Sequence, residues 1–243
     1  MRKIYLLPNL MTTGNFLCGM ISVSLSLKGD FPSASLWILV AMLFDFLDGQ
    51  VARLSKSMSK FGEEYDSLCD LMTFGIAPTI LIYEMSLSKL GRMGISIAFI
   101  YSVCCALRLA RYNAKLNKPS KYVFSGLPST AAGGAVAASV IAADHLEWLG
   151  IIGMAPFLMI LLAFLMISTI EYPKINALFL KRKSPFFYLV VGAVALGGFI
   201  FFGELSLAIG FILYVLGGPV YDIFHRTQLA ELLLEEPLKN VES

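Results

Sequence analysis

Residues 33–53 read SASLWILVAMLFDFLDGQVAR, and residues 66–87 read DSLCDLMTFGIAPTILIYEMSL. Each stretch is long and apolar enough for a helix that crosses the hydrocarbon core of a bilayer, which takes roughly 20 residues. Each also carries two aspartates near one end. Ionisable groups inside a membrane span are costly and usually mark a functional site. The two stretches therefore predict neighbouring membrane helices that share a polar site.

The composition of the whole chain agrees with a membrane protein. Of its 243 residues, 57% are hydrophobic and 15% are charged, whereas soluble domains have about 45–50% and about 25%. An ordinary water-soluble domain is thereby excluded. The net charge of +2 gives no reason to expect a nucleic-acid partner. We expect an all-α integral membrane protein in which residues 1–243 form a single polytopic domain.

The long apolar runs and the basic residues together predict a topology. Eight transmembrane helices are expected, at 10–28, 33–53, 66–87, 93–112, 126–143, 149–170, 185–202 and 206–223. With these spans, 16 of the 19 Lys and Arg residues fall on one side of the membrane, and only Lys28, Lys89 and Arg92 fall on the other. The positive-inside rule then places both termini in the cytoplasm.

Aspartates are concentrated in one part of the chain. Only seven are present, and Asp45, Asp48, Asp66 and Asp70 all lie within one window of 26 residues. Asp45 and Asp48 stand three residues apart near the end of the second span, and Asp66 and Asp70 stand four apart at the start of the third. Each pair therefore shares one helix face, at the cytoplasmic end of two antiparallel neighbours. We expect the four carboxylates to converge.

Converging carboxylates need a compensating positive charge. Their hard oxygen ligands suit Mg²⁺ or Mn²⁺, with Ca²⁺ as a further candidate, and do not suit zinc. Gly49 and Ala52 continue the stripe of Asp45 and Asp48 with almost no bulk, Arg53 adds a planar cation, and Gly62 opens the approach to the third helix. Such a pattern is typical of a site for a metal-bound diphosphate.

A second interpretation of the same residues has to be kept open. Buried acids also form proton or cation relays in transporters, and small residues such as Gly49 and Ala52 also allow close helix packing. A transporter would move ions across sealed vesicles and would release no product. It leaves the combination of Gly49, Ala52, Arg53 and Gly62 unexplained.

The complete string resembles a family signature. Asp45-x2-Asp48-Gly49-x2-Ala52-Arg53-x8-Gly62-x3-Asp66-x3-Asp70 is similar to the signature of the CDP-alcohol phosphotransferases, with all eight specified residues at the family's spacing. That family consists of integral membrane enzymes that displace CMP from a CDP-linked lipid or alcohol. The resemblance implies that the four aspartates are metal ligands and that Asp66 and Asp70 are catalytic, with Asp70 as general base. It assigns Gly49, Ala52, Arg53 and Gly62 to the CDP pocket.

Weaker motifs resemble one branch of the family. Pro8–Thr12 with Asn15 and Gly19, Leu107–Asn113 and Phe124–Ser129 look like the phosphatidylserine synthase branch of bacteria and archaea. This resemblance implies CDP-diacylglycerol and L-serine as substrates, membrane lipids around the protein, and a homodimer. Glycerol 3-phosphate and inositol phosphate are the alternative acceptors. The resemblance covers roughly residues 1–175, a six-helix catalytic core, and leaves a helix pair at 185–224 and a cytoplasmic tail at 225–243 without a motif.

Five further polar residues have two interpretations each. Asn9, Thr12 and Asn15 lie at the cytoplasmic depth of the first helix, where they either contact the CDP-lipid, as the resemblance implies, or cap and cross-link helices. Arg108 and Arg111 are three residues apart, so they can point together at an anion such as the serine carboxylate or a lipid phosphate. Alternatively, both are anchors whose charges reach the membrane interface.

Overall fold

The computed structural model describes residues 6–55, 59–115, 123–145, 149–173, 203 and 205–239. The helices are α1 (Leu6–Leu27), α2 (Phe31–Leu54), α3 (Lys60–Asp70), η2 (Leu71–Ile76), α4 (Ala77–Met85), η3 (Leu87–Leu90), α5 (Arg92–Lys115), α6 (Ser129–His145), α7 (Leu149–Ile167) and α10 (Leu205–Lys239). Two short strands, β1 (Val123–Ser125) and β2 (Glu171–Pro173), form one antiparallel pair. The predicted all-α class is confirmed.

Five helical segments of the described chain are long and apolar enough to cross a membrane. They are Pro8–Leu27, Phe31–Ala52, Lys60–Met85, Arg92–Ala114 and Leu205–Phe224, and α7 adds the shorter apolar stretch Gly153–Ile167. The spans predicted at 126–143 and 149–170 correspond to α6 and α7. The span predicted at 185–202 lies outside the described residues, so the total of eight stays a prediction.

Several predicted boundaries differ from the structure by three or more residues. The third span begins at Lys60 and not at 66, because the Ser59 side chain accepts a hydrogen bond from the Gly62 amide and caps the helix one turn earlier. The fifth predicted span begins at Ser129 and not at 126, because Gly126 has a φ of 84°, which an α-helix does not allow. The last helix does not end at 223; α10 continues to Lys239 through most of the predicted tail.

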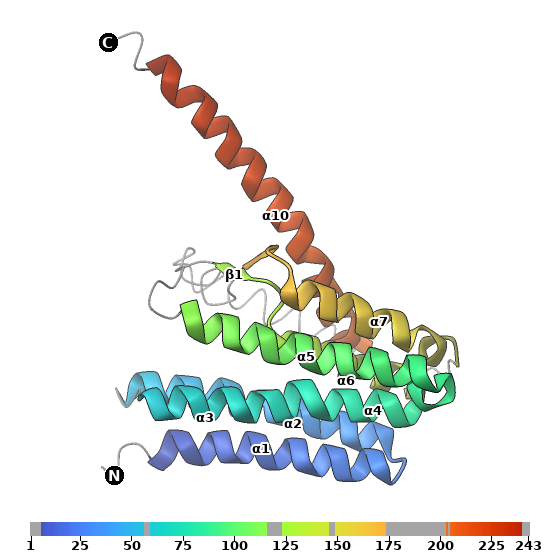
Figure 1. The fold of residues 1–243 in the computed structure, drawn as a ribbon. Helices are drawn as coiled ribbons and strands as arrows, with labels where there is room; N and C mark the ends of the chain where they lie inside the picture. The colour runs from blue at the N-terminus through green and yellow to red at the C-terminus, as the bar shows by residue number, and fades with distance from the viewer. Residues whose placement is uncertain are drawn as a thin grey trace.

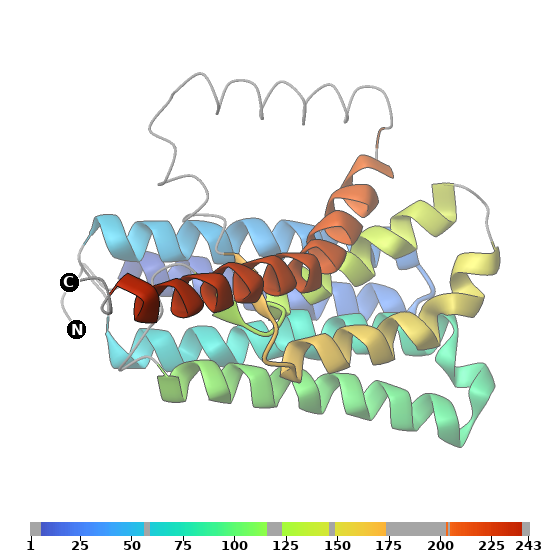
Figure 2. The same cartoon turned by 90° about the horizontal axis from the view of Figure 1, so that it is seen from above.

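Figure 1 shows α1, α2, the α3–α4 rod and α5 side by side and nearly parallel, with α6 and α7 packed against them. The start of α3 and the end of α5 lie at one end of this bundle, which we call the Lys60 end. The same end carries the start of α1 and the end of α2 in the view from above (Figure 2). The helices are thus antiparallel neighbours, as the predicted topology requires.

The rod from Lys60 to Met85 contains a π-helical turn, η2, directly after Asp70. The Thr73 hydroxyl in this turn donates to the Asn15 carbonyl at 3.1 Å, and a Cβ at Gly19 would lie 2.6 Å from that hydroxyl. Backbone contact this close requires a glycine on α1. The π-turn therefore holds α1 tightly against the rod beside Asp70, and π-turns of this kind are frequent at functional sites.

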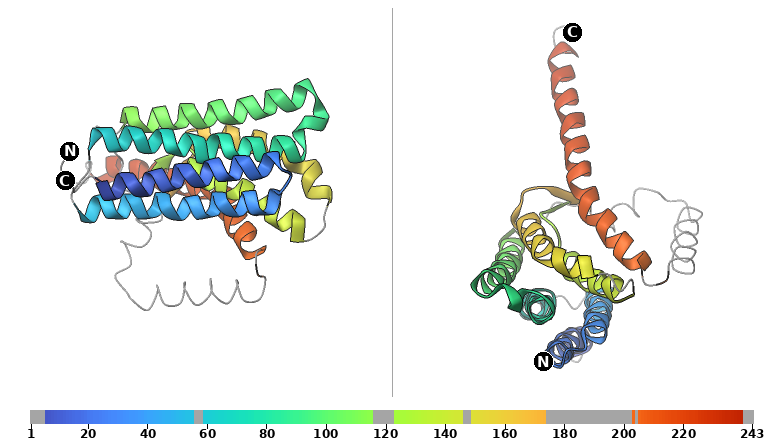
Figure 3. Two further views of the ribbon diagram at one scale, coloured as in Figure 1. Left: turned by 90° about the horizontal axis from the view of Figure 1, so that it is seen from below. Right: turned by 90° about the vertical axis from the view of Figure 1, so that its right-hand side faces the viewer.

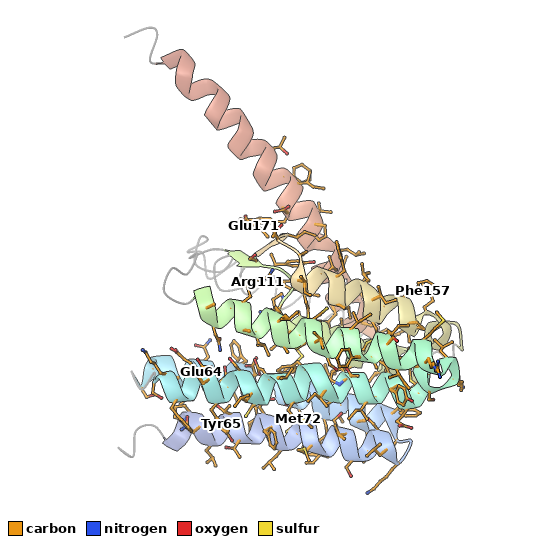
Figure 4. The ribbon with its side chains drawn as sticks, viewed as in Figure 1. Glu64, Tyr65, Met72, Arg111, Phe157 and Glu171 are labelled. Atoms are coloured by element: carbon orange, nitrogen blue, oxygen red, sulfur yellow. The ribbon has the colours of Figure 1, made fainter. Side chains whose placement is uncertain are left out.

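The last helix is inclined to the bundle, as Figures 1 and 3 show. The Tyr172 hydroxyl of β2 donates to the Val215 carbonyl at 3.1 Å, and the Glu171 amide donates to Asp222 at 3.1 Å. Near the start of α10, Ala208 packs on Ala138 and Ala142 of α6. Figure 4 places Glu171 beside α10, whereas Phe157 points away from the bundle and is 72% exposed, as expected of a lipid-facing side chain.

Candidate active site

Three of the four signature aspartates converge between α2 and α3. One carboxylate oxygen each from Asp45, Asp48 and Asp66 lies within 4.8 Å of the other two. The i, i+3 spacing on α2 turns Asp45 and Asp48 to one side, and α3 runs antiparallel to α2 along that side (Figure 2). Asp48 is buried and the other two are half-buried. Three carboxylates this close repel one another unless a cation or protons lie between them.

Helix α1 fixes two of the carboxylates by hydrogen bonds. The Thr12 hydroxyl donates to Asp48 Oδ2 at 2.9 Å, and Asn15 Nδ2 donates to Asp70 Oδ1 at 3.0 Å. Both donors are buried, with exposed fractions of 4% and 0%. Each bond engages one oxygen of its carboxylate. The structure therefore places Thr12 and Asn15 as partners of the aspartates, and their contact with a CDP-lipid stays a prediction.

Asp70 lies one helical turn from Asp66 and outside the group of three. It is buried, with an exposed fraction of 7%, and it borders the same cavity as Asp45 and Asp66. The expected convergence of all four carboxylates thus holds in the structure for three of them. Asp70 instead faces the place where a ligand of this cavity would lie.

The small signature residues lie around the Lys60 end of the acidic group. Gly49 and Ala52 are half-buried on α2, and Arg53 follows in the same helix, with its side chain outside the described part of the structure. Gly62 is half-buried, and a Cβ there would come within 3.2 Å of Ser59 Oγ and 3.5 Å of Asn9 Oδ1. Asn9 and Gly62 therefore lie close together, where α1 and α3 begin.

A cavity of about 710 Å³ opens beside the acidic group. It is bordered by α2, α3, α5, the start of α6, and α10. Its polar side chains come from Asp45, Asp66, Ser67, Asp70, Arg108, Tyr112, Ser129, Thr130, Ser206 and Tyr214, and its apolar lining includes Met42, Phe46, Leu109, Leu207 and Phe211. Volumes of this size accommodate small-molecule substrates.

Arg108 and Arg111 do not point together, contrary to the expectation from their spacing. Arg108 borders the cavity and donates from Nη1 to Ser129 Oγ at 2.6 Å. Arg111 turns toward the two strands (Figure 4), where its guanidinium donates to the carbonyls of Ser125, Met166, Ile167 and Ser168 at 2.5–3.2 Å. Of the two arginines, only Arg108 keeps the predicted anion-binding role. Arg111 caps the C-terminal carbonyls of α7.

Replacing Arg111 with alanine should lower the free energy of unfolding by at least about 3 kcal/mol, because hydrogen bonds to a charged group contribute about 1.5–3 kcal/mol each and several are lost together. Arg111→Lys should lose most of the same stability, since a point charge cannot reach four carbonyls at once. Thermal unfolding in detergent measures both changes. Arg92→Ala, at the exposed start of the same helix, is the control. Wild-type stability of Arg111→Ala would refute this structural role.

Several lining residues have no counterpart among the predicted site residues. Ser129 belongs to the Phe124–Ser129 motif, but the sequence alone predicts no role for its side chain. In the structure its hydroxyl accepts a hydrogen bond from Arg108. Ser67 exchanges hydrogen bonds with Asn113 across α3 and α5. The α10 residues Leu207 and Tyr214 lie more than 130 positions after Asp70, and no sequence signal connects them to the site.

The residues present fit a divalent cation. The three converging side chains supply only oxygen ligands, which hard cations prefer. Asp66 Oδ1 is buried and has no hydrogen-bond partner among the described residues. A buried carboxylate oxygen without a donor is costly, and a bound cation removes that cost. Carboxylates also hold Mg²⁺ in phosphoryl-transfer sites, together with substrate phosphates.

Comparisons with known proteins agree with this site. Residues 5–170 match the family model of the CDP-alcohol phosphatidyltransferases. The chain is 34% identical to a Helicobacter pylori (strain J99) protein named CDP-diacylglycerol–serine O-phosphatidyltransferase, over 91% of this chain and 92% of that protein. A Bacillus subtilis (strain 168) protein of the same name is 35% identical over 69% of this chain and 89% of its own length.

A third relative is named archaetidylserine synthase. The Methanothermobacter thermautotrophicus archaetidylserine synthase is 36% identical over 71% of each chain. The region that matches the family model, residues 5–170, contains the four aspartates, Arg108 and Ser129, and it ends before α10. The extent of the family match and the identity to these relatives show that this chain is a member of the CDP-alcohol phosphatidyltransferase family.

Proposed function

We propose that this protein transfers the phosphatidyl group of CDP-diacylglycerol to L-serine and releases CMP. The observation that carries the proposal is the convergence of Asp45, Asp48 and Asp66 beside a cavity that also holds Asp70 and Arg108. The names of the bacterial relatives support serine as the acceptor. Membership of a transferase family favours this reading of the acidic cluster over an ion relay.

Asp45, Asp48 and Asp66, with Asp70 beside them, would hold the divalent cation, which we expect to be Mg²⁺ or Mn²⁺, with Ca²⁺ as a further candidate. When bound, the cation neutralises the diphosphate as the bond to CMP breaks. Thr12 keeps Asp48 in its rotamer through the bond to Oδ2. Gly49, Ala52, Arg53 and Gly62, with Asn9, complete the proposed pocket for the CDP group. Gly49, Ala52 and Gly62 have little or no side chain, so they would admit the diphosphate close to the backbone.

Asp70 is proposed as the general base. Asn15 holds Asp70 Oδ1, so Oδ2 is the oxygen available to accept the proton of the serine hydroxyl. The serine oxygen then bonds to the lipid-linked phosphorus, and the bond from that phosphorus to the CMP oxygen breaks. Arg108, oriented by Ser129, faces the same cavity and can bind the serine carboxylate or the lipid phosphate.

The placement in the membrane belongs to the same proposal. We place both termini and the Lys60 end in the cytoplasm, on the distribution of basic residues, so that the site opens where serine and CMP are dissolved. Residues 1–175 would form the catalytic core, the region predicted at 185–224 would follow it, and the end of α10, from residue 225 on, would lie in the cytoplasm. The protein acts among membrane lipids as a homodimer.

An acceptor panel tests the proposal. Purified protein in micelles should release CMP from CDP-diacylglycerol only when L-serine and a divalent cation are both present, and EDTA should stop the release until Mg²⁺ or Mn²⁺ is restored in excess. Glycerol 3-phosphate and inositol phosphate are run in parallel with the same donor. Release with either of these and not with serine would overturn the acceptor. Ion flux in sealed liposomes without CMP release would overturn the enzyme.

A further inference from the structure

The hydroxyl of Tyr214 on α10 has no part in the chemistry described so far. The side chain is half-buried and borders the cavity. Within the part of the chain that the structure describes, this hydroxyl makes no hydrogen bond. A tyrosine hydroxyl inside a protein usually has a hydrogen-bond partner. Tyr214 therefore offers a donor to a ligand of the cavity, and it lies beyond residue 170, where the family match ends.

Residues that do not border the cavity hold Tyr214 in place. Its ring centroid lies 5.7 Å from that of Tyr172 on β2, with an interplanar angle of 42°. Tyr172 is fully buried, and its hydroxyl donates to the carbonyl of Val215, the residue after Tyr214. A Cβ on Gly218, one turn farther along α10, would collide with the Tyr172 ring. Because these contacts already order the Tyr214 side chain, little freedom is lost when a ligand binds to it.

Arg108 faces the same cavity from α5, and two contacts orient its guanidinium. Nη1 donates to Ser129 Oγ at 2.6 Å, and Cζ lies 6.0 Å from the ring centroid of Tyr112, where a cation is attracted to the ring. Arg108 makes no second hydrogen bond among the described residues. It is close enough to Tyr214 for the two groups to interact electrostatically. A cationic donor and a neutral donor thus share one region of the cavity, which suits an oxyanion.

The position of these two donors indicates which oxyanion they bind. Arg108 also interacts electrostatically with Asp70, the group proposed to accept the proton of the serine hydroxyl. In L-serine only Cα and Cβ separate the hydroxyl from the carboxylate, so a serine whose hydroxyl lies at Asp70 has its carboxylate within a few ångströms of that point. The diphosphate of the donor is proposed to lie on the cation that the acidic group holds. The acceptor's carboxylate is therefore the oxyanion left for Arg108 and Tyr214.

We infer that Tyr214 is a specificity-determining residue whose hydroxyl donates to the carboxylate of the acceptor, beside the guanidinium of Arg108. The inference rests on the proposed function, since that function supplies an acceptor with a hydroxyl and a carboxylate so close together. It gives α10 a part in the choice of acceptor. An alcohol without a carboxylate would leave both donors unpaired in a partly buried site, and unpaired donors of this kind discriminate against such a ligand.

Tyr214→Phe removes the hydroxyl and keeps the ring that packs on Tyr172. With CDP-diacylglycerol as donor, this change should raise KM for L-serine about ten-fold, while kcat and KM for the donor stay near wild type. Tyr221→Phe is the matched control, because Tyr221 lies two turns farther along α10, is exposed and does not border the cavity. An unchanged KM for serine would overturn the inference. So would a raised KM for the donor alone, which would place the lipid phosphate at Tyr214.

Equilibrium dialysis with radiolabelled L-serine tests the same contact without turnover. Protein in micelles is loaded with Mg²⁺ and CMP, so that no phosphatidyl group can be transferred. Tyr214→Phe should bind serine about ten-fold more weakly than wild type, and Tyr221→Phe should bind it equally well. From the wild type, β-hydroxypropionate, which has the carboxylate and the hydroxyl but no amine, should displace the label. Ethanolamine, which has the amine and the hydroxyl but no carboxylate, should not.

The outcomes of the dialysis separate the inference from the proposed function. Equal binding of serine by wild type and Tyr214→Phe would overturn the inference and leave the proposed acceptor intact. Displacement by ethanolamine and not by β-hydroxypropionate would do the same. Wild-type protein that binds CMP but no serine would show that the proposed acceptor is wrong, and the inference would fall with it.

Discussion

Replacing Asp70 with asparagine is expected to lower kcat for CMP release about 1,000-fold, within the range that a positioned acid or base contributes to proton transfer. Asparagine has nearly the same shape, and its Oδ1 can still accept the hydrogen bond from Asn15 Nδ2. The variant should therefore fold normally and still bind the donor. The measurements are kcat in micelles with CDP-diacylglycerol and serine, and thermal unfolding of the same preparation.

Asp144→Asn is the control for this experiment, because Asp144 is an exposed aspartate on α6 far from the acidic group in the sequence. It should have wild-type turnover. If Asp70→Asn kept kcat within about ten-fold of wild type, another group would have to accept the serine proton, and the assignment of the general base would be wrong.

The second large effect is expected on cation binding. Asp66→Asn should weaken Mn²⁺ binding by at least about 100-fold, since even residues that only orient a ligand contribute 10–100-fold to metal affinity. Asp66 offers an oxygen to the group of three and has a buried Oδ1 without a partner among the described residues. Titration of Mn²⁺ followed by electron paramagnetic resonance measures the affinity directly, without substrate or turnover.

Thr12→Val and Glu64→Gln give graded comparisons for that titration. Thr12 touches the group only through its bond to Asp48, so its loss should weaken Mn²⁺ binding about ten-fold. Glu64 is an exposed carboxylate two residues from Asp66, and its change to glutamine should leave the affinity unaltered. An unchanged affinity in Asp66→Asn would mean that the cation, if any, binds elsewhere.

The acidic pairs could be predicted from the sequence because they depend only on local geometry. A spacing of three or four residues fixes the shared face of one helix, and a short loop fixes the antiparallel neighbour. The same reasoning places Asp45, Asp48 and Asp66 together, as the structure shows. The position of the Asp70 carboxylate could not be predicted in this way, because it depends on a hydrogen bond from Asn15 on α1, which is 55 residues away in the chain.

The arginines show where local spacing fails. Residues three apart on a helix differ in direction by about 60°, so either a common or a separate target is possible. Arg108 donates a hydrogen bond to Ser129. Arg111 donates to the carbonyls of residues 166–168, which lie 55–57 residues later in the chain. Those partners exist only after α6 and α7 have packed. The part that α10 plays in lining the cavity could not be predicted from the sequence either, because Leu207, Gly210 and Phe211 are residues found in any membrane helix.

We propose that carboxylates from α2 and α3 hold a cation that contacts the diphosphate of the CDP-lipid. Phosphorus-31 electron–nuclear double resonance on Mn²⁺-loaded protein tests it most directly. With CDP-diacylglycerol bound, we expect a manganese–phosphorus coupling that is absent without donor and lost in Asp66→Asn. Mn²⁺ that binds without such a coupling, or a coupling that survives in Asp66→Asn, would contradict it.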